Sequence, residues 1–176
     1  MQFNLAMSSL NHIPALLKKI PWEPGQINLD VGGGRFDKAT NYLKDLGVEN
    51  IVIDPHARSL EHNYEAASRL TSLGRADSAT LSNVLCVIRE KKKRLDALRF
   101  CCSMLKPGGK LYVSIYAGDG TGRGKSTKSK TWQNNRPLRT YLKEIKEIFP
   151  NACLEKGFIS STKEAEDECG TRTKIV

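Results

Sequence analysis

Apolar residues recur along this chain in two alternating patterns. Short continuous runs predict buried strands, whereas apolar positions spaced three and four residues apart predict amphipathic helices. The strands are expected at 26–31, 49–54, 79–87, 110–116 and 151–160. The helices are expected at 8–20, 37–46, 59–73, 90–105 and 137–149. Because strands and helices alternate, we predict an α/β fold with a Rossmann-like, mostly parallel sheet that carries helices on both faces.

Two stretches depart from this alternation. Residues 117–136 are rich in Gly, Ser, Thr and Lys and nearly lack apolar residues before Trp132, which predicts a long exposed loop. Residues 162–176 form a polar tail without a clear periodicity. No internal repeat divides the 176 residues, and we therefore expect a single domain that spans residues 1–176.

Positive charge is concentrated in one part of the chain. Residues 117–150 hold eight Lys and Arg against three Asp and Glu, and they contribute +5 to a net charge of +9. A concentrated basic segment suits a polyanion, which makes nucleic acid a candidate partner. The alternative is a basic surface that serves only to keep the protein solvated.

Other features bear on location and metal binding. No apolar run approaches the ~18 residues that span a bilayer, so no membrane partner is expected. The first residues lack the pattern of a secretory signal, which favours a cytoplasmic protein. The five cysteines are odd in number and lack C-x-x-C spacing, so no metal site is predicted.

The main chemical signal follows the first strand and reads DVGGGRFD at 30–37. Glycines after a strand let the backbone turn sharply and approach a ligand at the start of the next helix. A dinucleotide-binding loop needs G-x-G-x-x-G, but Asp37 replaces the third glycine and would oppose a pyrophosphate. Asp30, placed before the loop, instead suits a ligand that carries an ammonium group and no phosphate. S-adenosylmethionine is such a ligand.

The second strand ends at Asp54, 24 residues after Asp30. In nucleotide-binding sheets, a carboxylate at about this separation accepts hydrogen bonds from ribose hydroxyls. Taken alone, Asp54 could equally be a surface residue that caps the strand. Together with the glycine loop, it indicates a ligand that contains ribose.

Four short motifs resemble those of class I S-adenosylmethionine-dependent methyltransferases and occur in that family's order. They are LDVGGG at 29–34, IVIDP at 51–55, SNVL at 82–85 and LKPGGKL at 105–111. The small size and the basic loop are also reminiscent of phage-encoded members. The resemblance implies an abbreviated methyltransferase fold, S-adenosylmethionine as the cofactor and methyl transfer as the activity.

The resemblance also implies roles for the matching positions. Asp30 is expected to help hold the methionine end of the cofactor, with the glycines passing close beneath it. Asp54 is expected to bind the ribose, Asn83 to lie near the methyl group and Asp77 to contact the adenine amino group. The implied cofactor-binding residues are Asp30, Gly32, Gly33, Gly34, Asp54, Pro55, Asp77 and Asn83.

The acceptor is expected beyond the strand at 110–116. Tyr116 ends this strand at the expected edge of the active site, and the basic loop that follows could act as a substrate-binding lid. Its cations suit phosphate, and Trp132 could stack on a base. The predicted substrate-binding residues are Tyr116, Arg123, Lys125, Lys128, Lys130 and Trp132. No residue stands out as a general base, so the catalytic residues are unassigned.

Departures from the family pattern keep other functions open. Phe36 stands where the family often has a third glycine, and residues 69–78 hold few residues that favour a strand. The motifs of the DNA amino- and cytosine C5-methyltransferases are absent. The leading hypothesis is a methyltransferase that acts on nucleic acid or on a nucleotide-like or small acceptor. The alternatives are a protein of this fold that binds nucleic acid or a protein partner without catalysis, and an enzyme that cleaves S-adenosylmethionine.

Overall fold

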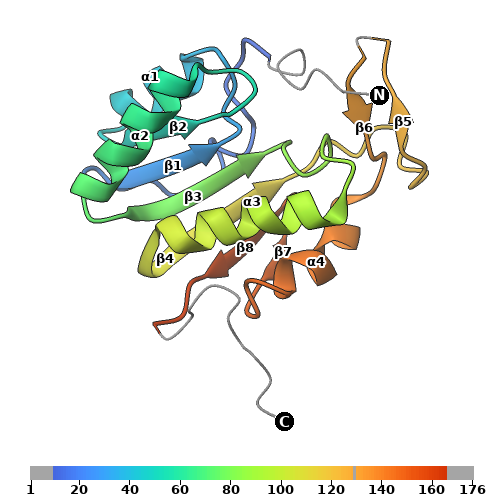
Figure 1. Cartoon of the computed structure of the whole chain (residues 1–176). Helices are drawn as coiled ribbons and strands as arrows, with labels where there is room; N and C mark the ends of the chain where they lie inside the picture. The colour runs from blue at the N-terminus through green and yellow to red at the C-terminus, as the bar shows by residue number, and fades with distance from the viewer. Residues whose placement is uncertain (1–9, 129, 166–176) are drawn as a thin grey trace.

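Six strands form one sheet in the computed structural model, which describes residues 10–128 and 130–165. The sheet has the order β2-β1-β3-β4-β8-β7 (Figure 1). The first four are mutually parallel, and the β7–β8 hairpin adds two strands at one side, β8 running antiparallel to β4. The strands are β1 (Ile27–Val31), β2 (Glu49–Ile53), β3 (Ala76–Ser82), β4 (Leu105–Ser114), β7 (Cys153–Glu155) and β8 (Phe158–Thr162).

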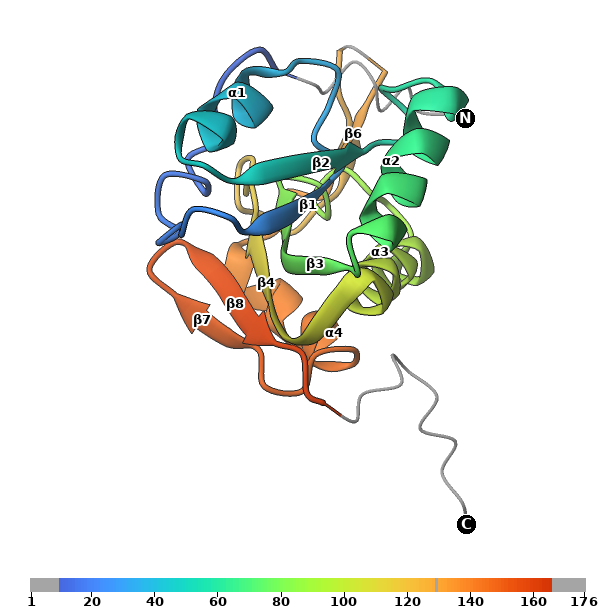
Figure 2. The same ribbon diagram turned by 90° about the vertical axis from the view of Figure 1, so that its left-hand side faces the viewer.

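Helices cover both faces of this sheet (Figure 2). α2 (Leu60–Ser72), α3 (Lys91–Met104), the 3₁₀ helix η2 (Leu138–Tyr141) and α4 (Leu142–Lys146) pack on one face, where the largest apolar cluster lies. α1 (Lys38–Asp45) and the turns at 13–20 cover the other face with two smaller clusters. The prediction of a mostly parallel, Rossmann-like sheet with helices on both faces is therefore confirmed. None of the helices in the described ranges combines the length and the apolar character that a membrane span requires.

The helix expected at 8–20 is wrong over residues 10–20, and residues 8 and 9 lie outside the described part. This segment forms successive turns, in which Leu17 N donates to Pro14 O at 3.1 Å and Lys19 N donates to Leu16 O at 2.9 Å. Pro14 and Pro21 leave only six residues between them, too few to offset the cost of starting an α-helix. The apolar positions are nevertheless buried, since Leu16 and Leu17 are 2% and 0% exposed.

β2 lies at one edge of the sheet, because no further strand of the described chain pairs with its outer side. α2 leads directly into β3, which agrees with the few strand-favouring residues at 69–78. Side chains of α2 meet the open edge instead. His62 Nε2 hydrogen-bonds Val52 O at 3.1 Å, and the Asn63 side chain pairs with Asp54 N at 2.8 Å and Asp54 O at 3.0 Å. These contacts satisfy part of an edge that would otherwise be available to another strand.

The C-terminal third differs in detail from the expected elements. The loop at 117–136 contains a small hairpin of β5 (Lys125–Ser126) and β6 (Trp132–Gln133), and the strand expected at 151–160 is the β7–β8 hairpin. The polar tail begins inside β8. Lys163 is buried, and its Nζ donates to Cys102 O and Leu105 O at 2.8 and 3.0 Å, at the C-terminal end of α3. A cation is favourable at this end of a helix. The tail beyond residue 165 lies outside the described ranges.

Candidate functional site

A cavity of about 820 Å³ opens at the carboxyl ends of the parallel strands. Loops that follow β1, β2, β3 and β4 line it, together with residues from the N-terminal turns and from β6. Ligands bind at this edge in open α/β sheets because the loops there converge around the crevice. The predicted site residues that line the cavity are Asp30, Gly32, Gly33, Gly34, Asp54, Pro55, Asn83, Tyr116 and Trp132.

The glycine loop forms one wall, and neither Gly32 nor Gly33 has space for a side chain. Gly32 and Gly34 have φ values of +72° and +78°, a conformation that other residues rarely adopt. Gly33 approaches Asp30 so closely that a Cβ added there would lie 2.5 Å from Asp30 Oδ2. Phe36, which replaces the family's third glycine, also lines the cavity, beyond the three glycines.

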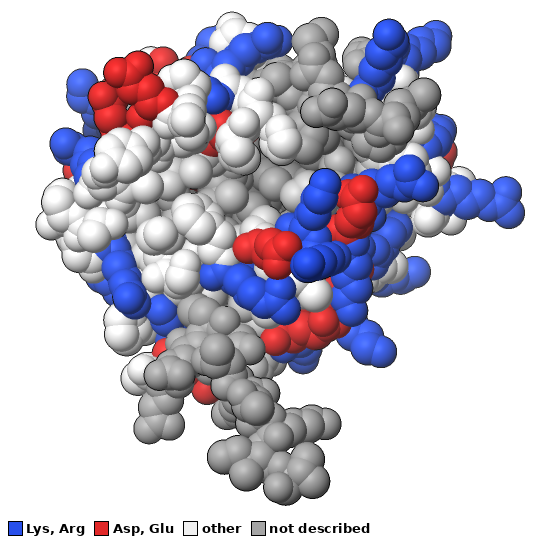
Figure 3. Space-filling model, viewed as in Figure 1, with Lys and Arg blue, Asp and Glu red and all other residues white. Residues whose placement is uncertain are grey.

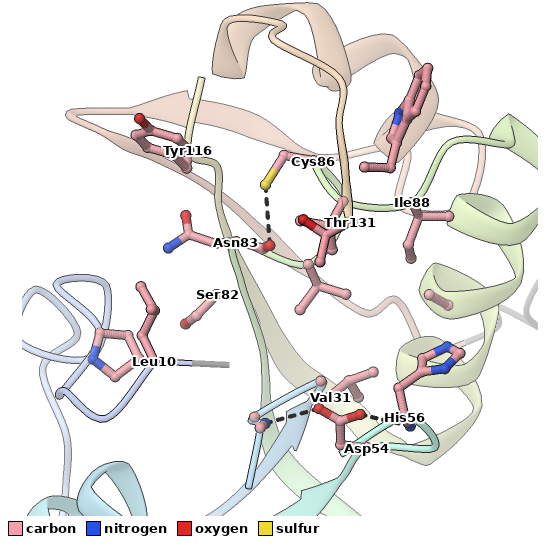
Figure 4. Close-up of a pocket in the computed structure, with 18 of the residues that line it drawn as sticks. Leu10, Val31, Asp54, His56, Ser82, Asn83, Cys86, Ile88, Tyr116 and Thr131 are labelled. Atoms are coloured by element: carbon pink, nitrogen blue, oxygen red, sulfur yellow. Dashed lines mark hydrogen bonds between the residues drawn. The ribbon is translucent and has the colours of Figure 1, made fainter. Parts of the chain in front are cut away.

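Asp54 connects this loop to the turn that follows β2. Its Oδ2 accepts a hydrogen bond from Gly34 N at 3.0 Å, and its Oδ1 accepts from His56 N and Ala57 N, both at 2.9 Å (Figure 4). Arg58 fixes the other side of the loop, because its Nε donates to Gly34 O at 2.7 Å. The carboxylate expected to bind ribose therefore also positions the loop. Sequence reasoning missed Arg58, which no local pattern distinguishes from other surface arginines.

Asp30 is almost fully buried, at 1% exposure, yet it reaches the cavity. Burial raises the pKa of Asp30 to about 6, a shift that the nearby Asp54 carboxylate adds to and that hydrogen bonds from Thr80 and Asn50 oppose. An acid held in this way loses stabilisation by water and gains from a cation placed beside it. Perturbed acids of this kind are typical of functional sites.

The last residue of β3 and the turn that follows it contribute two polar groups. Asn83 has a φ of +61°, and its carbonyl accepts a hydrogen bond from Cys86 Sγ at 3.1 Å. Ser82 lines the cavity, and its buried Oγ has no hydrogen-bond partner in the described structure (Figure 4). An unpaired buried hydroxyl is costly unless a ligand or water completes it. Ser82 belongs to the SNVL motif but was not among the predicted binding residues.

The structure does not bring Asp77 to this site. Asp77 lies at the amino end of β3, and its Oδ2 accepts a hydrogen bond from Ile27 N at 2.8 Å. Its Oδ1 forms an ion pair with Lys106 at 2.6 Å. The expected contact with adenine is therefore wrong. Asp77 ties the start of β1 to β3 and to the turn before the glycines of β4, at the opposite edge from the cavity.

The basic residues of the loop also lie away from the cavity. Arg123, Lys125, Lys128 and Lys130 are exposed and do not line it. Lys125 pairs with Asp119 at 2.8 Å, and this contact lowers the pKa of Asp119 to about 2. The face seen in Figure 3 carries many Lys and Arg side chains, with Asp and Glu among them, toward α4 and the start of α3, whereas the surface over α2 is mostly uncharged.

The end of the loop is a fixed wall of the cavity rather than an exposed segment. Asn134 is 6% exposed, and its Nδ2 donates to Leu85 O and Ile88 O at 3.0 and 2.9 Å. Its backbone N donates to Cys86 O at 2.8 Å. Trp132 Nε1 donates to Asn134 Oδ1 at 2.8 Å. The polar composition that predicted exposure here instead supplies hydrogen bonds to a neighbouring loop.

Buried charges secure the same wall from behind. Glu144 of α4 pairs with Arg94 at 2.7 Å and with Arg136 at 2.8 Å. Burial alone would raise the pKa of Glu144, but the hydrogen bonds from the two guanidinium groups outweigh it and lower that pKa. Arg94 also donates to Ile88 O and Arg89 O at 2.9 and 2.7 Å. The loop at 84–90 is therefore held from two sides.

Known structures share this architecture. A 1,6-didemethyltoxoflavin-N1-methyltransferase from Burkholderia thailandensis, with S-adenosylhomocysteine bound, matches with a TM-score of 0.60 at 17% identity, over 81% of this chain and 72% of its own. A SAM-dependent methyltransferase from Methanosarcina mazei matches with a TM-score of 0.58 at 15% identity, over 88% of this chain and 99% of its own. Human N-acetylserotonin methyltransferase, in complex with SAM, has a TM-score of 0.56 at 17% identity, over 85% of this chain and 50% of its own.

Sequence comparison adds no closer relative. No protein-family model matches the chain, and no curated protein matches it. The structural matches lie at sequence identities where only the fold is informative. The chain has the Rossmann-like fold of S-adenosylmethionine-dependent methyltransferases.

Proposed function

We propose that this protein binds S-adenosylmethionine in the 820 Å³ cavity and transfers its methyl group to an acceptor. The observation that carries the proposal is the convergence of Asp30, the glycine loop and Asp54 on one cavity, beside the unpaired Ser82 hydroxyl. Matching folds in structures that contain S-adenosylhomocysteine or SAM support the same cofactor.

The lining residues fit this molecule. A buried carboxylate at Asp30 suits the ammonium group of the methionine end, and the side-chain-free loop at 32–34 permits close approach. Asp54 accepts three backbone hydrogen bonds through two oxygens, which leaves acceptor capacity for a ribose hydroxyl. Pro55 and Asn83 are proposed to flank the nucleoside, and the Ser82 hydroxyl to complete a polar contact.

S-adenosylmethionine would be held by Asp30, the glycine loop and Asp54, and it would supply an electrophilic methyl group for a nitrogen or oxygen lone pair of the acceptor, which would lose a proton. The chain's own contribution is to align the acceptor and exclude water. The fixed wall at 131–135 suits this role. No described side chain is assigned as a base.

The acceptor is proposed to enter between Tyr116 and the wall at 131–135. The exposed positive charges of Lys128 and Lys130 would favour a nucleic-acid acceptor. These side chains, however, do not reach the cavity. A nucleotide-like or other small acceptor agrees better with the cavity lining. A phage origin is not part of this proposal.

Calorimetric titration tests the proposal directly. SAM and S-adenosylhomocysteine should bind with one-to-one stoichiometry, whereas NAD, which needs a pyrophosphate-binding loop, should not bind. Failure of SAM to bind, or equal binding of NAD, would contradict it. Incubation with SAM alone, followed by product analysis, separates methyl transfer from cleavage, because only cleavage proceeds without an acceptor. Binding without turnover on any acceptor would favour the non-catalytic alternative.

A further inference from the structure

The acceptor half of the cavity, which is the end away from Asp54, contains an aromatic ring and an apolar side chain. Figure 4 shows Tyr116, Cys86 and Thr131 at the end away from Asp54. Tyr116 is 64% exposed, although it lines the cavity, so its ring is available to a ligand. Ile88 lies toward the same end (Figure 4), whereas Val84, which also lines the cavity, packs against Gly32 of the glycine loop. An exposed aromatic ring with an apolar side chain at the same end suits a flat aromatic ligand.

Two cations stand at the rim of this half. Arg89 and Lys93 line the cavity, from the loop before α3 and from its first turn. The Arg89 guanidinium lies over the Trp132 ring, 4.8 Å from its centroid, which holds the charge in place at the rim. Glu90 also lines the cavity but pairs only loosely with Lys93, at 3.9 Å. Arg89, Glu90 and Lys93 therefore leave one net positive charge there.

We infer that the acceptor is a small, planar aromatic molecule that carries an anionic group, a carboxylate or a phosphate. Its ring lies against Tyr116, and its anion pairs with Arg89 and Lys93. This inference rests on the proposed function, because it names the substrate class of the same site. Fixed guanidinium groups bind carboxylate and phosphate through charge-assisted hydrogen bonds, which makes Arg89 the principal anchor.

A polymer is a poorer fit to the same surface. The lysines that would follow a nucleic-acid backbone, Lys125, Lys128 and Lys130, are exposed on the β5–β6 hairpin and outside the cavity. Lys125 is already paired with Asp119. The Trp132 ring already carries Arg89 on one face and lies next to Gly124, where an added Cβ would meet it at 2.2 Å, so Arg89 competes with a base for stacking on this ring.

Binding to matched probe pairs tests the inference without requiring turnover. The pairs are adenosine 5′-monophosphate with adenosine, and 4-hydroxybenzoate with 4-hydroxybenzamide, each titrated against the protein saturated with S-adenosylhomocysteine. At least one anionic probe should bind about tenfold more tightly than its neutral partner, and added salt should weaken only the anionic one. Arg89→Gln combined with Lys93→Gln should reduce this preference to about twofold or less.

Two further variants make the result specific. Lys128→Gln combined with Lys130→Gln removes the same charge from the hairpin and should leave the preference unchanged. Glu90→Gln should strengthen binding of the anionic probe, because it removes the negative charge at the rim without removing a helix cap; the Glu90 side chain makes no capping hydrogen bond. Unfolding midpoints of all variants establish that the fold is retained.

Three results would overturn the inference. One is equal binding of both members in each pair. A second is an unchanged preference in the Arg89 and Lys93 variant. The third is preferential binding of a single-stranded oligonucleotide that is lost in the hairpin variant. Failure of the proposed function is distinct, because it appears as no binding of SAM or S-adenosylhomocysteine, while probe preference remains measurable on the protein alone.

Discussion

The Thr80 hydroxyl donates a hydrogen bond to Asp30 Oδ1 at 3.1 Å, across the β1–β3 pairing that places these two residues side by side. Asn28 Nδ2 donates to Thr80 Oγ1 at 3.0 Å, which extends a buried polar chain beneath α1. This chain supports Asp30 but does not offset its removal from water, since burial raises the pKa of Asp30 to about 6. The ionised form of Asp30 therefore lowers the stability of the folded protein. A cationic ligand beside the carboxylate would offset this effect.

Asp30→Asn is expected to stabilise the fold at neutral pH. The pKa of Asp30 is raised from 3.8 to about 6, so the folded state favours the protonated acid. Its ionisation lowers stability progressively between about pH 4 and pH 6, by about 3 kcal/mol in total for a shift of this size. Urea unfolding should show a stabler variant at pH 7 and no difference near pH 3.5. SAM binding should be lost in the same variant.

The opposite outcome at pH 7, a destabilised Asp30→Asn variant, would mean that the polar chain through Thr80 stabilises the carboxylate more than burial opposes it. Loss of binding together with a gain in stability is the pattern of a residue retained for function.

Gly33→Ala should destabilise the protein and abolish SAM binding. The new Cβ would lie 2.5 Å from Asp30 Oδ2 and 3.0 Å from Val52 Cγ1, and Thr80 holds the Asp30 carboxylate in place. Overpacking of this kind costs about 1–3 kcal/mol. Gly120→Ala is the control, because its φ is +71° but no atom lies within 4 Å of an added Cβ. The control should lose about 1 kcal/mol of stability through backbone strain and bind SAM as before.

Local sequence was sufficient to predict the glycine loop and Asp54. Each is set by a short apolar strand and the residue that ends it, and parallel strands bring their carboxyl ends together without further information. β3 was harder because its first half, ADSA, holds no residue type that favours a strand. The strand was predicted three residues too late, at 79–87. Asp77 was assigned to adenine through the family resemblance, whereas it lies inside β3, at the edge of the sheet away from the site.

Long-range hydrogen bonds account for the other errors. Three polar residues were predicted to lie in an exposed loop but are buried. They are Gln133, Asn134 and Asn135, which are 8%, 6% and 1% exposed. Gln133 Nε2 donates to Tyr116 O at 2.8 Å, and Asn135 Nδ2 donates to Arg123 O at 2.9 Å. Burial through side-chain bonds to distant carbonyl groups leaves no periodic signal in the sequence.

Asp54→Ala should weaken SAM binding by about 1–3 kcal/mol, the usual cost of losing a hydrogen bond to a charged group. The folded state should lose stability as well, because the carboxylate accepts hydrogen bonds from Gly34, His56 and Ala57. Calorimetry and urea unfolding measure the two effects separately. Asp96→Ala, an exposed acid paired with Arg99, should change neither. Unchanged SAM affinity in Asp54→Ala would remove the ribose assignment.

Asn134→Ala should detach the wall of the acceptor half from the loop at 84–90. It removes a buried donor to Leu85 O, a partly buried donor to Ile88 O and the partly buried acceptor of Trp132 Nε1. Unsatisfied buried groups of this kind should cost about 2–4 kcal/mol, and trypsin should cleave faster at the cationic residues between 123 and 130.

SAM affinity should persist, since none of these bonds contacts the glycine loop, whereas affinity for the anionic probes should fall because Trp132 no longer fixes Arg89. Asn151→Ala changes an exposed asparagine that bonds Glu164, and it should leave the cleavage rate unaltered. Equal cleavage rates in wild type and Asn134→Ala would show that the wall is held by other contacts, of which the Arg136–Glu144 pair is then the leading one.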